Sequence, residues 1–263
     1  MIAEDAQQSA QGLEYRPLRD ANPAAPAADP PAGPTGRLKT GQARILGGGV
    51  EPAAAALKPR LRGWLHAGTF PFALAGGIVL ISLSRPGAAA AACSVYALSA
   101  CLLFATSAVF HRGTWSPRGE AVLRRLDHAS IFLIIAGTYT PLAVVLLPTR
   151  RQQVLLAVVW TGALAGIAFR TLCLGAPRWL YTPAYLALGW VAVLYLPDFA
   201  RTGGTTVVAL VIAGGLLYTA GGIVYALKRP DPSPRWFGFH EVFHALTIAA
   251  FTAHYTAVLL AAT

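Results

Sequence analysis

The segment FHEVFH at residues 239–244 carries the pattern with the clearest chemical meaning in this chain. On a helix, His240 and His244 are four residues apart, so their imidazoles project from one face and can bind the same metal ion. With Glu241 they complete H-E-x-x-H, in which zinc proteases use the glutamate as a general base. No acidic residue follows Glu241, and the longer protease motif with a downstream glycine and histidine is not matched. The pair therefore predicts a metal site whose third ligand lies earlier in the chain.

The elements that position this pair are predicted to be membrane-spanning helices. The chain has 263 residues, of which 55% are hydrophobic and only 12% are charged, about half the charged fraction of a typical soluble domain. Apolar runs long enough to cross a bilayer recur without the alternating pattern of barrel strands. We therefore predict an all-α integral membrane protein with a seven-transmembrane helix bundle. The predicted spans cover residues 64–84, 88–111, 127–147, 152–172, 178–199, 204–227 and 239–261.

The distribution of basic residues predicts the orientation of this bundle. Twelve Lys and Arg residues lie near the end where the first span begins, and four lie at the opposite end. By the positive-inside rule, the N-terminus is cytoplasmic and the C-terminus extracytoplasmic. The net charge of +10 does not predict nucleic-acid binding, because the basic residues are scattered through loops. Residues 1–60 are rich in Ala and Pro and predict a disordered cytoplasmic tail, and residues 61–263 form the predicted membrane domain.

This orientation brings further polar side chains to the depth of the histidine pair. His111 ends the second predicted span, and Asp127 opens the third, both on the cytoplasmic side. His111 is the best candidate for the third ligand of His240 and His244. Three protein ligands with one open position are typical of catalytic zinc, which lowers the pKa of a bound water towards about 7. Asp127 is then the candidate either for holding that water or for orienting one of the imidazoles, and Ser107, one turn from His111, for hydrogen bonding into the site.

The remaining histidines have simpler interpretations. His66 and His128 lie at the ends of predicted spans, where packing or interfacial positions are common, although both can line the mouth of a site. His254 lies about two and a half turns beyond His244 and is expected to line a cavity or to pack. These three residues are not assigned as ligands.

Three motifs together resemble the hemolysin III branch of the progestin and adipoQ receptor (PAQR) family. They are SAVFH at 107–111, RRLDHASIFLIIAGTYTPL at 124–142 and FGFHEVFH at 237–244. The resemblance implies a seven-helix bundle with a cytoplasmic N-terminus and zinc bound by His111, His240 and His244. It also implies that Asp127 bonds the water on the zinc and that Ser107 is the helix-2 serine of the family. The glutamate position is not a ligand in this family, so Glu241 is expected to be the least important polar residue of the motif.

The function that these residues favour is zinc-dependent hydrolysis of an amide or ester bond in a membrane lipid, similar to the ceramidase activity attributed to receptor relatives. The alternatives are a cytolytic, pore-forming or membrane-homeostasis protein with structural zinc, and an intramembrane zinc protease. A membrane lipid is the expected substrate or ligand, the cell membrane is the expected location, and the oligomeric state stays open.

Overall fold

The computed structural model describes residues 59–173 and 178–263, and within these ranges the regular elements are helices. The prediction of an all-α protein is therefore confirmed, and the predicted tail at residues 1–60 lies almost entirely outside the described residues. The elements are α1 (Trp64–Leu83), α2 (Ala88–Arg112), α3 (Pro117–Leu146), α4 (Thr149–Leu172), α5 (Arg178–Gly189), the 3₁₀ helix η1 (Trp190–Tyr195), α6 (Leu196–Leu227) and α7 (Phe239–Ala262).

The start of α3 differs from the prediction for a local reason. The helix begins at Pro117, ten residues before the predicted start at 127. Ser116 is its N-cap, and the Ser116 hydroxyl accepts a hydrogen bond from the backbone N–H of Gly119 at 3.2 Å. A capping serine followed by proline at the first helical position is a strong start signal. Asp127 therefore lies inside α3, in its third turn, instead of opening the helix.

Six helical segments in the described part are long and apolar enough to cross a membrane. One of them, Leu180–Leu227, contains 48 residues and folds back at Gly204, where φ is +81° and the helix is interrupted. The indole N–H of Trp190 donates to the Thr219 hydroxyl at 2.9 Å, and the earlier Tyr181 meets the later Tyr225, so the two halves run antiparallel. This one segment covers nearly all of two predicted spans, 178–199 and 204–227.

The outer surface of the helices is apolar, as expected for a protein that faces lipid. Phe72 is 78% exposed, Leu98 is 64% exposed and Leu194 is 70% exposed. A soluble protein rarely leaves so many large apolar side chains in water. With the six segments of membrane-spanning length, this surface identifies an integral membrane protein.

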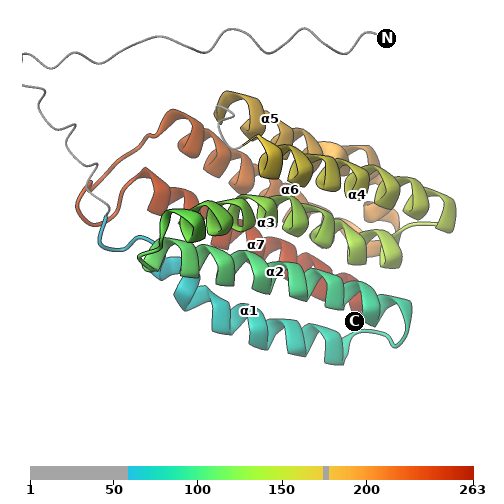
Figure 1. Ribbon diagram of the computed structural model, residues 1–263. Helices are drawn as coiled ribbons and strands as arrows, with labels where there is room; N and C mark the ends of the chain where they lie inside the picture. The colour runs from blue at the N-terminus through green and yellow to red at the C-terminus, as the bar shows by residue number, and fades with distance from the viewer. Residues whose placement is uncertain (1–58, 174–177) are drawn as a thin grey trace, which may run out of the picture. The chain divides into compact units, whose positions relative to one another are not determined.

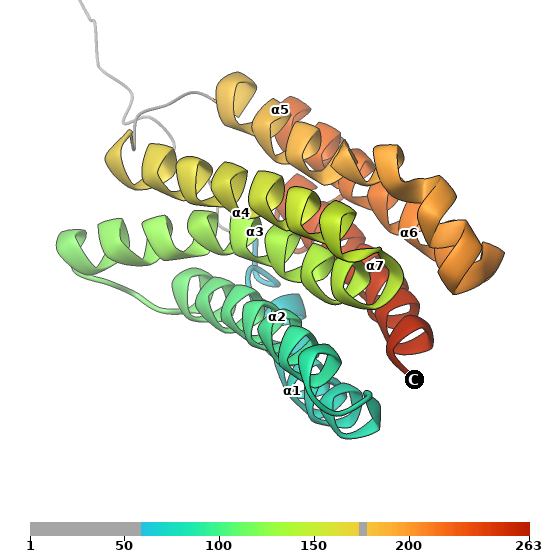
Figure 2. The same ribbon diagram turned by 90° about the vertical axis from the view of Figure 1, so that its right-hand side faces the viewer.

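Helix α7 lies inside the bundle, where it packs against α1, α2, α3 and α6 (Figures 1 and 2). The sequence provides the small residues that close helix packing requires, including Ala250 and Ala257, both fully buried. A central α7 places the histidines of its first two turns between neighbouring helices. The fold thus converts the i, i+4 pair of the sequence into a buried site.

Candidate metal centre

Three histidine side chains meet where α2 ends and α7 begins. His111 lies in the last turn of α2, and His240 and His244 lie in the first two turns of α7. The Nε2 atoms of His111 and His240 are 3.1 Å apart, and one nitrogen from each of the three residues lies within 4.8 Å of the others. All three side chains are buried. The structure thus brings together the three predicted ligands, although 129 residues separate His111 from His240.

The donor set fits a transition-metal ion. Two imidazoles bound to one tetrahedral zinc, at about 2.0–2.1 Å each, have their nitrogens about 3.3 Å apart, close to the 3.1 Å between His111 and His240. The Nδ1 atom of His244 is also buried without a hydrogen-bond partner among the described residues. A buried nitrogen in this state is costly unless a ligand satisfies it. The cluster can therefore hold a metal ion, and imidazole ligands suit zinc among others.

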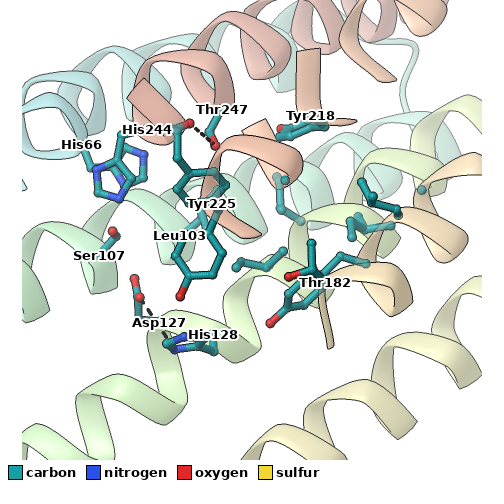
Figure 3. A pocket seen from close by; sticks show the side chains of 18 of the residues that line it. His66, Leu103, Ser107, Asp127, His128, Thr182, Tyr218, Tyr225, His244 and Thr247 are labelled. Carbon is teal, nitrogen blue, oxygen red and sulfur yellow. Dashed lines mark hydrogen bonds and ion pairs between the residues drawn. The ribbon is translucent and has the colours of Figure 1, made fainter. Parts of the chain in front are cut away.

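Asp127 and Ser107 lie beside the histidines. The Asp127 Oδ2 atom is 3.9 Å from the Nε2 atom of His111, and the Asp127 side chain is 14% exposed. Ser107 is buried in α2 one turn before His111, and its side chain lies beside the Asp127 carboxylate. Figure 3 shows the two side chains facing each other below the rings of His66 and His244. The site therefore combines three nitrogen donors with one adjacent carboxylate and a serine hydroxyl beside that carboxylate.

The neighbouring His128 has a different partner. Its Nδ1 atom lies 2.7 Å from the carbonyl oxygen of Arg124, one turn earlier on α3, and 3.9 Å from Asp127 Oδ2. His128 also lies in the wall of the cavity described below. It flanks the carboxylate and lies outside the three-histidine cluster found among the described residues.

Glu241 is engaged on both carboxylate oxygens. Its Oε1 accepts from the Arg62 guanidinium at 2.7 Å, and its Oε2 accepts from the backbone N–H of Gly238 at 2.8 Å. The second bond is half of a capping box at the start of α7. Glu241 is 0% exposed. Glu241 therefore links the start of α7 to the segment before α1, a structural role that the motif alone does not predict.

That segment, residues 59–63, is held against the metal centre by backbone contacts as well. The N–H groups of Arg60 and Leu61 donate to the carbonyls of Arg235 and Trp236 at 2.9 and 3.2 Å. Gly63 has φ of +81°, and a Cβ there would lie only 2.8 Å from the Cβ of His111. A glycine is needed here both for its conformation and for the close approach to His111.

His66 is a site neighbour that spacing alone does not predict. It lies in the first turn of α1, is 2% exposed, and stacks on His244 with ring centroids 3.7 Å apart and an angle of 12° between the planes. Neither of its ring nitrogens has a hydrogen-bond partner among the described residues. The packing interpretation of His66 is supported, and the partner it packs on is a candidate ligand. The only sequence signal for this contact is a histidine in the first turn of a span.

The cluster lies in the wall of a cavity of about 830 Å³ with a mainly apolar lining. This volume lies within the usual range for small-molecule sites, about 300–1,000 Å³. The lining runs along α7 from His240 to His254, and along α3 from Asp127 to Leu142, about 20 Å at 1.5 Å per residue. The Nε2 atom of His254, at the far end of the cavity, lies 3.1 Å from the carbonyl oxygen of Val211. The cavity can thus hold a long apolar group with one end at the metal centre.

Comparisons with known proteins agree with this architecture. A family model described as haemolysin-III related matches residues 54–255, which include every residue of the metal centre. Hemolysin-3 of Bacillus cereus is 33% identical over 154 residues, covering 58% of this chain and 70% of that protein. The Hemolysin-3 homolog of Bacillus subtilis (strain 168) is 30% identical over 167 residues, covering 63% and 75%. The chain therefore belongs to the haemolysin-III related family.

Proposed function

We propose that the protein is a membrane hydrolase that holds zinc at His111, His240 and His244 and cleaves an amide or ester bond of a membrane lipid. The observation that carries this proposal is the position of the three histidines and Asp127 in the wall of a long apolar cavity. A purely structural metal site has no need of a substrate-sized cavity or of an adjacent carboxylate with its own orienting serine.

Each side chain has a role in this proposal. A bound zinc supplies Lewis acidity, which polarises a carbonyl group and activates water. The Asp127 carboxylate, 3.9 Å from His111 Nε2, takes up the proton of the attacking water and returns it to the leaving group. Ser107, beside the carboxylate, is positioned to orient it. The apolar cavity binds the lipid chain and excludes water from it.

The orientation belongs to the proposal as well. We infer seven passes, because Leu180–Leu227 doubles back at Gly204, and a cytoplasmic N-terminus from the excess of basic residues at the metal-centre end. The hydrolysed bond then lies near the cytoplasmic leaflet. Reporter fusions at the C-terminus test this directly: periplasmic or extracellular activity supports the orientation, and cytoplasmic activity overturns it.

The central experiment combines metal analysis with turnover of a lipid amide and a lipid ester by the purified protein. His244→Ala is expected to lose the metal and all turnover. Asp127→Asn is expected to keep the metal and lose turnover by about 10²-fold or more, the usual contribution of a general base. Asp198→Asn is a matched control, because Asp198 pairs with Arg151 and does not line the cavity. Full turnover by metal-free protein would contradict the proposal.

A second candidate function comes from the names of the relatives. Two similar proteins are called Hemolysin-3 and a Hemolysin-3 homolog, which suggests lysis of membranes. Leakage from liposomes that persists after metal removal and in Asp127→Asn favours this function over hydrolysis. Proteolysis is disfavoured, because both oxygens of Glu241 are already bonded within the fold and the general base of a zinc protease must be free to reach water.

A further inference from the structure

The same cavity holds a buried cation that the proposed chemistry does not use. Arg170, near the end of α4, is 3% exposed and lines the cavity. Its Nε and Nη1 atoms have no hydrogen-bond partner, and no carboxylate pairs with it among the described residues. An uncompensated buried charge costs several kcal/mol. An ionisable residue at membrane depth that keeps this cost usually marks a functional site.

Further polar groups line the cavity together with Arg170. Its guanidinium lies 4.2 Å from the ring centre of Tyr181 on α5, a cation–π contact that offsets only part of the cost of burial. On the same helix, Thr182 Oγ1 and Tyr185 OH are buried without partners among the described residues. Residues 181, 182 and 185 project to one side of a helix, and all three line the cavity with Arg170. This wall therefore offers several donors that have no hydrogen-bond partner among the described residues.

The cavity wall formed by Arg170, Tyr181, Thr182 and Tyr185 is close to the metal centre. The hydroxyls of Tyr181 and Tyr225 are 3.5 Å apart, and the Tyr225 ring lies 6.0 Å from that of His240. On the α3 side, the His128 ring lies 6.1 Å from the Tyr181 ring. Tyr181 thus lies between Arg170 and the metal centre. It approaches that centre through Tyr225 on one side and through His128 on the other. A ligand with its polar end at the histidines also has that end near Arg170.

We propose that Arg170 binds the oxyanion, a carboxylate or phosphate, of an amphiphile whose apolar chain fills the cavity. The planar guanidinium matches such an oxyanion in a two-pronged geometry, and the hydroxyls of Thr182 and Tyr185 supply further donors. This inference rests on the proposed function, because it narrows the proposed lipid substrate to an anionic lipid. The binding itself is measurable without turnover.

The test compares ligands of one chain length on the purified full-length protein in a neutral detergent. The probes are oleate, oleoyl lysophosphatidic acid, uncharged oleyl alcohol and inorganic phosphate. Hydrogen bonds to a charged group predict that both anionic amphiphiles bind roughly ten- to a hundredfold more tightly than the alcohol. The stronger of the two identifies the carboxylate or the phosphate as the preferred group. Inorganic phosphate that binds as tightly as either amphiphile overturns the inference.

Variants separate Arg170 from the metal. Arg170→Gln is expected to abolish the preference for the anionic amphiphiles, whereas Arg150→Gln, an exposed arginine on the same helix, keeps it. His244→Ala is expected to lose the metal and still prefer the anions, so the preference does not depend on hydrolysis. An unchanged preference in Arg170→Gln overturns the inference. If this variant does not fold, equal binding of oleate and oleyl alcohol by the unmodified protein overturns it.

Discussion

Replacing Glu241 with glutamine tests whether this residue is an anchor or a general base. The Glu241 carboxylate accepts from Arg62 at 2.7 Å and from the Gly238 N–H at 2.8 Å. Glutamine keeps one acceptor oxygen for the Gly238 N–H and loses the ion pair with Arg62. Removing one partner of a fully buried ion pair costs about 3–5 kcal/mol. The Arg62 side chain is 21% exposed, so water compensates part of this loss. We expect the free energy of unfolding to fall by about 2–3 kcal/mol.

Thermal unfolding in detergent measures this loss. For a chain of this size, 1 kcal/mol corresponds to about 2–4 °C in Tm, so Glu241→Gln is expected to lower Tm by about 4–12 °C. Glu241→Ala also removes the helix cap and is expected to cost about 1 kcal/mol more. The matched control is Glu120→Gln, since Glu120 forms an exposed i, i+4 pair with Arg124 worth less than about 0.5 kcal/mol.

The same variants distinguish the two roles of Glu241. As an anchor, Glu241→Gln keeps the metal and, at temperatures well below its Tm, keeps most of the turnover. If Glu241→Gln has the Tm and metal content of the unmodified protein but no turnover, the anchor role of Glu241 is refuted. Its role as the general base of a zinc protease is then supported.

Three further predictions concern the neighbours of the metal centre. Gly63→Ala places a Cβ 2.8 Å from that of His111 at a positive φ. It is expected to lower the free energy of unfolding by about 1–3 kcal/mol and to weaken metal binding in chelator competition. Gly68→Ala, where the new Cβ meets no atom within 4 Å, is the control, and equal metal affinity in both variants contradicts the reasoning. His66→Phe keeps a ring stacked on His244 and is expected to retain the metal in elemental analysis; loss of the metal would instead make His66 a ligand. Ser107→Ala removes the hydroxyl beside Asp127 and is expected to lower kcat about five- to tenfold at unchanged metal content, so an unchanged kcat would contradict its positioning role.

Local patterns predicted much of the fold and of the site. The lengths of the apolar runs predicted membrane helices because spanning a bilayer requires a fixed length of helix. The spacing of His240 and His244 predicted one shared face because that geometry is a property of a single helix. The start of α3 was missed although its signals, Ser116 and Pro117, are local, since the apolar run that defined the span begins only after them.

Other features depended on contacts between helices. Glu241 belongs to a six-residue motif, but its partner Arg62 precedes it by 179 residues. The motif itself does not predict that contact. The stacking of His66 on His244 likewise requires α1 to pack beside α7. Arg170 reads in the sequence as one of many basic residues at a helix end, and only its burial among Tyr181, Thr182 and Tyr185 separates it from the others.

The sequence by itself therefore determined the membrane class, the helices and the residue types able to bind a metal, because these follow from length, hydropathy and spacing along a single chain segment. Only the tertiary structure decided which side chains share the site, which carboxylate lies beside the histidines and which cation faces the cavity. Asp127 is adjacent to the histidines and Glu241 is occupied elsewhere, a difference set by how α3, α7 and the segment before α1 pack. Such choices depend on distances between segments far apart in sequence, and these distances exist only once the bundle has formed.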